Sequence, residues 1–259
     1  MNKDKLCFIF NNEELLVRIK DDHILIPNDS DFKKLDINLT SLDSFTTKGN
    51  ENFLFGELSE TFLETSGFKF YKLRNIISLM DKSIFNLAAK AFHLIKWSNT
   101  YKYCSKCGAL VTNKEDERAK ICPKCGFISY PRISPAIITA IVKDKKLLLA
   151  HNTNFPPKTY SVIAGFVEPG ETFEDCVSRE VFEEIGITVK NIKYFGSQPW
   201  PFPDSLMVAF TCEYADGEIK IDGIEIDDAS FYGVDEFPSL PLGGSIARRL
   251  IDWFEDNYK

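Results

Sequence analysis

The segment from residue 165 to residue 187 constrains this chain more than any other part of its sequence. It reads GFVEPGETFEDCVSREVFEEIGI. Thr172 followed by Asp175 is a Thr-x-x-acid signal for the start of a helix, and Gly186 is a natural C-terminal stop. We therefore expect one helix of about three to four turns, from Phe173 to Ile185.

This expected helix carries a stripe of carboxylates beside an apolar stripe. At about 100° per residue, Glu180, Glu183 and Glu184 point in neighbouring directions. Glu180 and Glu184 repel each other at a spacing of four residues unless a cation compensates, and Mg²⁺ or Mn²⁺ suits such oxygen ligands. The alternative is a solvated acidic face paired with Arg179. The expected apolar stripe consists of Phe173, Val177, Val181 and Ile185.

The whole segment resembles the Nudix box, G-x5-E-x7-R-E-U-x-E-E-x-G-U, where U is aliphatic. Gly165, Glu171 and Gly186 occupy fixed positions of that pattern, together with the arginine and the three glutamates. The resemblance implies a metal-dependent hydrolase that cuts nucleoside diphosphates linked to another group. A Nudix fold, an α/β/α sandwich, is implied as well.

In the Nudix family, the glutamates of the box hold the metals and the arginine orients their carboxylates. One glutamate can also act as general base. Carried onto this sequence, the resemblance makes Glu184 the expected base, with Glu183 as the competing choice. Glu180, Glu183 and Glu184 become metal ligands, and Arg179 becomes the orienting residue.

Four cysteines form two knuckles, Cys104-Ser-Lys-Cys107-Gly and Cys122-Pro-Lys-Cys125-Gly. Thiolates at this spacing can converge tetrahedrally on Zn²⁺ at about 2.3 Å and leave no position for water. The alternatives are a redox pair or unconnected core cysteines. We expect one structural zinc ion per chain. The other cysteines are expected to be buried thiols, namely Cys7, Cys176 and Cys212.

Composition excludes several classes of function. The chain has 259 residues, 44% of them hydrophobic, and a net charge of −7. This balance argues against a broad nucleic-acid surface, because phosphate binding needs clustered lysine and arginine. No apolar run approaches the ~20 residues of a membrane span, and the first residues lack a signal-peptide core. A cytoplasmic protein without a membrane segment is expected.

The sequence pattern divides the chain into three expected domains. Residues 1–98 favour a small β-rich (α+β) domain that ends in a helix near 84–97. Residues 99–130, which contain both cysteine knuckles, are expected to form a zinc ribbon, with a charged and solvated tip at 114–120. Residues 131–259 alternate strands with helices, as in an α/β sandwich. Strands are expected there at 137–142, 147–151, 160–164, 206–214 and 231–234, with a final helix at 245–257.

The segment 197–205, SQPWPFPDS, follows the expected helix. Its prolines alternate with aromatic residues, so we expect a stiff surface loop that cannot join a sheet ladder. On composition alone this could be a packing loop. After a Nudix-type helix, however, it is similar to the signature of NADH pyrophosphatases within the Nudix superfamily. That resemblance covers the chain from about Leu87 to the C terminus, including the ribbon.

The resemblance to NADH pyrophosphatases implies further roles. The aromatic residues Tyr130 and Phe166 are expected against the nicotinamide end of a dinucleotide, and Glu225 as an additional metal ligand. The side chain of Gln198 and the backbone of Ala247 are expected near the substrate. The family counterpart of the N-terminal domain contributes to a homodimer.

The expected function is hydrolysis of the pyrophosphate bond of NADH, and more slowly of NAD⁺, to AMP and nicotinamide mononucleotide. Trp200 is expected to hold the proline-rich loop around the nicotinamide. A second hypothesis keeps this chemistry but places the bond at the 5′ end of NAD-capped RNA. A third is a non-catalytic ligand sensor, which is disfavoured because sensors tend to lose glutamates of the box.

Overall fold

The computed structural model describes residues 4–21, 23–34, 42–47, 51–58, 67–221, 223–241 and 243–259. The chain divides into two compact units, residues 1–132 and 133–259. Within the described ranges, no helix is both long and apolar enough to cross a membrane.

The first unit begins with a mixed six-stranded sheet in the order β3-β2-β1-β5-β4, with β6 paired to β2. Strand β1 pairs in parallel with β5 and antiparallel with β2. Its apolar run from Cys7 to Phe10 is fully buried, as expected for a central strand covered on both faces. The strands are β1 (Cys7–Asn11), β2 (Glu14–Lys20), β3 (His23–Leu25), β4 (Asp43–Thr46), β5 (Asn52–Glu57) and β6 (Lys69–Lys72).

Helices complete this N-terminal sheet domain. The short helix α1 (Asp29–Lys34) and the 3-10 turns η2 (Leu73–Asn75) and η3 (Ile77–Leu79) flank it. Helix α2 (Lys82–Thr100) begins earlier and ends later than the expected range of 84–97. Phe92 of α2 packs against Phe10 of β1, with 5.2 Å between ring centroids. The domain therefore has the predicted β-rich character.

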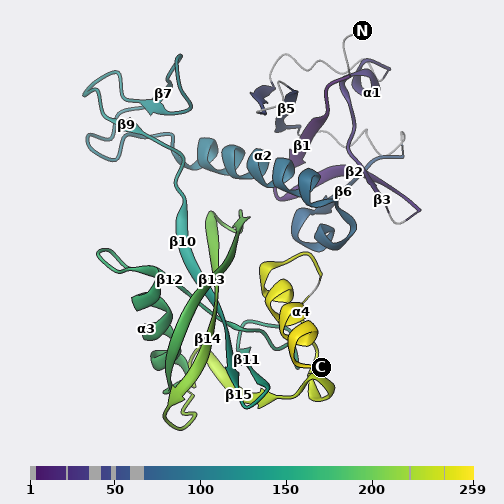
Figure 1. Cartoon of the computed structure of the whole chain (residues 1–259). Coiled ribbons are helices and arrows are strands. Elements are labelled where there is room, and N and C mark those ends of the chain that lie inside the picture. Colours follow the sequence, from purple (N-terminus) through teal and green to yellow (C-terminus); the bar gives the residue numbers. More distant parts are fainter. Residues whose placement is uncertain are drawn as a thin grey trace. The chain divides into compact units, whose positions relative to one another are not determined.

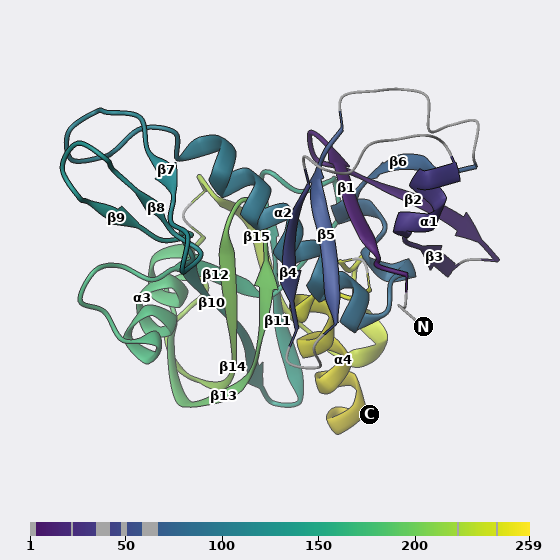
Figure 2. The ribbon, with the colours of Figure 1, turned by 90° about the horizontal axis from the view of Figure 1, so that it is seen from above.

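Three two-residue strands lie side by side in the zinc-ribbon region (Figure 2): β7 (Thr112–Asn113), β8 (Lys120–Ile121) and β9 (Ile128–Ser129). The β7–β8 hairpin carries the charged tip, which is not simply solvated as predicted. Arg118 donates to the Ser44 carbonyl of β4 at 3.0 Å, and Ala119 is buried. The tip is largely exposed yet anchored to the N-terminal sheet.

The second unit is a sheet in the order β13-β14-β10-β11-β15, with β12 paired to β10. Helix α3 (Phe173–Ile185) covers one face and α4 (Ile246–Tyr258) the other, which confirms the α/β/α sandwich (Figure 1). Along β10, Ile137 and Ile141 face the α3 side, whereas Ile138 and Ala140 face the α4 side. The strands are β10 (Ser134–Lys143), β11 (Lys146–Asn152), β12 (Ile163–Phe166), β13 (Thr188–Trp200), β14 (Ser205–Asp216) and β15 (Ile226–Tyr232).

Two strand predictions need correction. The strand expected at 160–164 begins only at Ile163, since Tyr160 instead donates its N–H to the Ser239 carbonyl. The strand expected at 231–234 starts earlier, at Ile226, and Val234 opens the 3-10 turn η4 (Val234–Glu236).

The prediction that residues 197–205 cannot join a sheet ladder is wrong. Residues 197–200 are the end of β13 and pair with β14, Pro199 opposite Leu206 and Trp200 opposite Ser205. Because β13 is the edge strand, a proline without an N–H can be accommodated there. Only residues 201–204 form the turn between the two strands.

Candidate functional site

Helix α3 has the predicted bounds, Phe173–Ile185, because its terminal signals are satisfied locally. The hydroxyl of Thr172 accepts a hydrogen bond from the N–H of Asp175 at 3.2 Å. Gly186 closes the helix in the left-handed conformation, with φ of 72°, which a glycine adopts at little cost. These caps fix which residues of the box face the sheet.

The buried face of α3 differs from the predicted apolar stripe at two residues, Phe173 and Glu184. Val177, Val181 and Ile185 are buried as predicted, but Phe173 is partly exposed, because this first helical residue only leans on Phe210. Glu184, by contrast, is only 6% exposed. A carboxylate therefore lies among the buried positions of the helix.

Arg179 forms hydrogen bonds with several carboxylates of the box. Its guanidinium binds Glu171 through two hydrogen bonds, of 2.7 and 2.9 Å, and donates to Glu180 and Glu183 at 2.9 Å each. It also donates to the carbonyl of Phe166 at 3.0 Å, which ties the helix to the end of β12. One cation thus orients three carboxylates.

These ion pairs shift the pKa values of the groups in opposite directions. The hydrogen bonds from Arg179, followed by the backbone N–H of Glu168, lower the pKa of Glu171 to about 2. Hydrogen bonds to its carboxylate partners, above all Glu171, raise the pKa of Arg179 above its already high usual value. Glu171 and Arg179 are therefore a permanently charged pair at neutral pH.

The carboxylate of Glu180 is partly buried. Partial burial is the largest cause that raises its pKa, and the charges of Glu183 and Glu225 raise it further, whereas Arg179 lowers it. Its carboxylate also lies against the backbone of β12: a Cβ added to Gly165 would stand 1.9 Å from the carboxyl carbon. Glycine at position 165 makes room for this carboxylate.

The donor set fits a hard divalent cation. The charges of Glu183 and Glu225 both act on the carboxylate of Glu180, and such oxygen ligands suit Mg²⁺ or Mn²⁺. Arg179 already donates to Glu171, Glu180 and Glu183. A bound divalent cation would relieve the repulsion between carboxylates that remains. Among the described residues these carboxylates do not form a close ligand cluster, and Glu183, 58% exposed, is bound to Arg179.

Residues of the proline-rich segment are tied to helix α4. The side chain of Gln198 is buried, donates to the Gly244 carbonyl at 2.9 Å and accepts from the N–H of Ile246 at 2.6 Å. This pair of bonds fixes the chain at the first turn of α4, which contains Ala247. Trp200 meets Phe202 edge-on at 5.3 Å. The sequence did not predict that both the amide nitrogen and the amide oxygen of Gln198 bind the backbone at this turn.

The two aromatic residues expected at the nicotinamide lie in different units. Phe166 ends β12 in the second unit and is 54% exposed although it is aromatic. Tyr130 follows β9 in the first unit and is also exposed. Its hydroxyl donates to the carboxylate of Glu117 at 3.2 Å, and the charge of Glu117 raises the pKa of this phenol.

The two cysteine knuckles have the same backbone geometry. In each, the first cysteine accepts from the N–H of the glycine, Gly108 to Cys104 and Gly126 to Cys122, at 2.9 Å. Both glycines have φ near +70°. The four sulfur atoms lie within 4.8 Å of one another, close to the ~3.8 Å spacing of a tetrahedron with bonds of about 2.3 Å. The site therefore fits a structural zinc ion.

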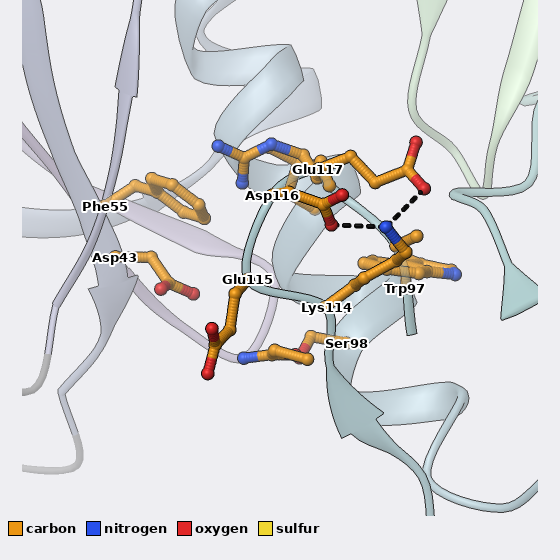
Figure 3. Close-up of a pocket in the computed structure, with 12 residues that line it drawn as sticks. Asp43, Phe55, Trp97, Ser98, Lys114, Glu115, Asp116 and Glu117 are labelled. Carbon is orange, nitrogen blue, oxygen red and sulfur yellow. Dashed lines mark hydrogen bonds and ion pairs between the residues drawn. The ribbon is translucent and has the colours of Figure 1, made fainter. Parts of the chain in front are cut away.

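A cavity of about 280 Å³ lies between the ribbon tip, α2 and the strands β4 and β5 (Figure 3). Phe55 and Asp43 face it from the strands, and Glu115 faces it from the ribbon. Lys114 pairs with Asp116 and, at 3.1 Å, with Glu117. These acids make the cavity an unsuitable place for a pyrophosphate.

Three parts of the chain match family models of known proteins. Residues 132–254 match the NUDIX domain and residues 99–130 match the NADH pyrophosphatase zinc ribbon domain. Residues 4–97 match an NADH pyrophosphatase-like rudimentary NUDIX domain, for which sequence reasoning had found no motif. An NAD-capped RNA hydrolase NudC from Stutzerimonas stutzeri is 38% identical over 91% of this chain and 85% of its own.

The chain belongs to the Nudix hydrolase family. It is therefore an enzyme of the hydrolase class, of the type with an NADH pyrophosphatase zinc ribbon. NudC of Pseudomonas fluorescens is 40% identical over 90% of this Nudix hydrolase and 83% of its own length. Among solved structures, a NUDIX hydrolase from Nitrosomonas europaea is 25% identical, with a TM-score of 0.53. It covers 60% of this chain and 92% of its own.

Proposed function

We propose that this Nudix hydrolase cleaves the pyrophosphate bond of NADH, and more slowly of NAD⁺, to AMP and nicotinamide mononucleotide. The observation that carries the proposal is the set of glutamates on α3 that Arg179 orients at the end of β12. The match to the zinc ribbon domain of NADH pyrophosphatases supports the choice of substrate.

Glu180, Glu183, Glu184 and Glu225 would hold the catalytic cation, Mg²⁺ or Mn²⁺. When bound, such a cation neutralises charge on a pyrophosphate and lowers the pKa of a coordinated water. Arg179 keeps Glu180 and Glu183 in place through charge-assisted hydrogen bonds. Most of the rate would come from positioning and charge neutralisation, as in phosphoryl transfer generally.

Glu184 is the proposed general base. Its carboxylate lies among buried residues of α3, one turn beyond Glu180, and is 6% exposed. In our proposal it takes a proton from the water that attacks phosphorus, while the nucleoside monophosphate leaves. Glu183 remains the competing base, although its present contact with Arg179 favours a role in orientation.

The substrate's nicotinamide end is assigned to aromatic residues. Phe166 is exposed beside the carboxylates, since its carbonyl accepts from Arg179, and its ring is available for stacking. Tyr130 and Trp200 are proposed to complete this end. Gln198 would act by fixing the first turn of α4, and the backbone of Ala247 in that turn is proposed to contact the substrate.

The same chemistry on NAD-capped RNA is the second candidate. It is favoured by the relatives from Stutzerimonas stutzeri and Pseudomonas fluorescens, each described as an NAD-capped RNA hydrolase. We further propose three domains, residues 1–98, 99–130 and 131–259, and a homodimer that works in the cytoplasm. The molar mass in sedimentation equilibrium tests the dimer.

The proposed function is tested by comparing kcat/KM for NADH, NAD⁺, ADP-ribose and NAD-capped RNA with Mg²⁺ or Mn²⁺. ADP-ribose shares the pyrophosphate but lacks the nicotinamide ring. We expect wild type to prefer NADH and Phe166→Ala to lose about five- to 150-fold on NADH, since base stacking is worth ~1–3 kcal/mol. ADP-ribose should change little. Equal losses on both substrates would contradict the role of Phe166, and no turnover of any of these compounds would contradict the function.

A further inference from the structure

A β-bulge interrupts the pairing between β11 and β15, which are neighbouring strands of the second unit (Figure 1). The register shifts between His151 and Asn152, so that Asp227 of β15 stands opposite no residue of β11. Ala229 and Ile226 both pack on the α3 side of the sheet, although they are three positions apart. In a regular strand, residues at an odd spacing point to opposite faces, so the bulge is what brings Ile226 to this side.

The bulge also determines where Glu225 lies. Glu225 directly precedes Ile226, and its charge acts on the carboxylate of Glu180 on α3. A change of register by one residue would turn the residues beyond the bulge to the other face. The N–H of Thr153 donates to the carbonyl of Glu225 at 2.9 Å, and its hydroxyl donates to the carbonyl of Ile224 at 3.1 Å. The end of β11 therefore holds the backbone that carries Glu225.

The side chain of His151 holds the extra residue of the bulge. Its Nδ1 lies 2.6 Å from a carboxylate oxygen of Asp227, and its Nε2 lies 3.3 Å from the carbonyl oxygen of Pro156. A carboxylate and a carbonyl only accept, so both ring nitrogens donate, as in an imidazolium. The hydrogen bond to Asp227 is the main cause that raises the pKa of His151. The ring is also packed 5.5 Å from that of Tyr160, between centroids.

We infer that His151 is a positioning residue: by binding Asp227, it holds the bulge of β15 in the register that brings Glu225 close to Glu180. This role rests on the proposed function, in which Glu225 is a ligand of the catalytic cation, and it names the side chain that keeps this ligand in place. Groups that orient metal ligands from outside commonly contribute 10- to 100-fold to metal affinity. Since His151 acts through the backbone, we expect an effect at the lower end, about 10-fold.

The test measures binding of Mn²⁺ to the full-length protein without substrate, from the electron paramagnetic resonance signal of the free ion. Two variants separate the two ring nitrogens. His151→Asn places an amide nitrogen near the position of Nδ1 and keeps a donor for Asp227, whereas His151→Gln places it near Nε2 and loses that donor. His151→Gln should raise Kd for Mn²⁺ about 10-fold, and His151→Asn should retain wild-type affinity.

A second variant approaches the same bond from the other side. Asp227 is 51% exposed, so Asp227→Ala should fold normally. If His151 acts through Asp227, His151→Gln should change Mn²⁺ affinity little in the Asp227→Ala background. The matched control is Lys146→Ala, which removes a 3.2 Å ion pair with Glu236 at the other end of β11 and should bind Mn²⁺ like wild type. Circular dichroism confirms that each variant is folded.

Kinetics on NADH provide an independent readout. At saturating Mn²⁺, His151→Gln should retain wild-type kcat, while the Mn²⁺ concentration for half-maximal rate rises about 10-fold. A residue that only stabilises the fold would lower Tm without this shift. Unchanged Mn²⁺ affinity in His151→Gln, or an equal loss in His151→Asn, would overturn the role of His151. Failure of the proposed function would show separately, as absence of NADH turnover in wild type, because Mn²⁺ binding is measured without turnover.

Discussion

At the scale of single residues, Arg179 explains why the box needs its fixed positions. Its guanidinium holds Glu171 with two bonds and still reaches Glu180 and Glu183. Lysine could not replace it, because a planar fork is needed to bind one carboxylate in this way while donating to others. The resemblance to the Nudix box implied an orienting role for this arginine, and these hydrogen bonds are contacts that such a role would use.

The depressed pKa of Glu171 leads to a prediction about acid stability. A carboxyl whose pKa falls from 4.5 to about 2 on folding stabilises the native state above about pH 4.5, and this contribution is lost as the pH falls toward 2. Glu171→Gln should therefore lower Tm at pH 7 by at least about 2 °C, with a difference from wild type that shrinks by pH 3. Thermal scans by circular dichroism measure it. A constant difference from pH 7 to pH 3 would refute this linkage.

The second prediction at this scale concerns the base. Glu184→Gln preserves shape and should leave folding and zinc content intact, but should lower kcat on NADH at least ~100-fold, since a positioned base contributes about 10² to 10⁴. Glu174→Gln, an exposed glutamate in the first turn of the same helix, is the control and should retain full activity. Steady-state kinetics decide; activity of Glu184→Gln within a few-fold of wild type would move the role to Glu183.

At the scale of elements, the best predictions came from local signals. The bounds of α3 follow from Thr172 and Gly186, both of which act within one turn of the helix end. The burial of Glu184 accords with its direction on a helical wheel. It lies about 40° from Glu180, within the range of directions of the apolar side chains. Phe173 shares that direction, yet its place at the helix end leaves it partly exposed.

Features that depend on distant pairing could not be predicted. Pro199 enters a strand because β13 is at the edge of its sheet, and nothing in the local sequence identifies an edge. The N-terminal domain pairs β1 in parallel with β5 and antiparallel with β2, as β10 pairs with β14 and β11. That shared pairing accords with the match to a rudimentary NUDIX domain, but no motif for the box accompanies it.

The ribbon gives a prediction at the element scale. Its three strands have two residues each, so the four thiolates, not a hydrophobic core, should hold it together. Protein purified without added metal should contain about one zinc per chain. Chelation should raise amide hydrogen exchange across residues 104–125 and leave residues 133–259 protected. Zinc-free protein with a disulfide between two of these cysteines would contradict the zinc site.

At the scale of the whole molecule, the chain combines a match to the NUDIX domain, a zinc ribbon and a match to a rudimentary NUDIX domain. In our proposal, the second unit carries the hydrolytic carboxylates.

We propose that this enzyme breaks the pyrophosphate bond of NADH. The most direct measurement is chromatographic identification of the products after purified protein is incubated with NADH and Mg²⁺ or Mn²⁺. We expect AMP and reduced nicotinamide mononucleotide in equal amounts, and their loss in Glu184→Gln. Intact NADH, or cleavage at the ribosyl–nicotinamide bond to give ADP-ribose, would contradict it.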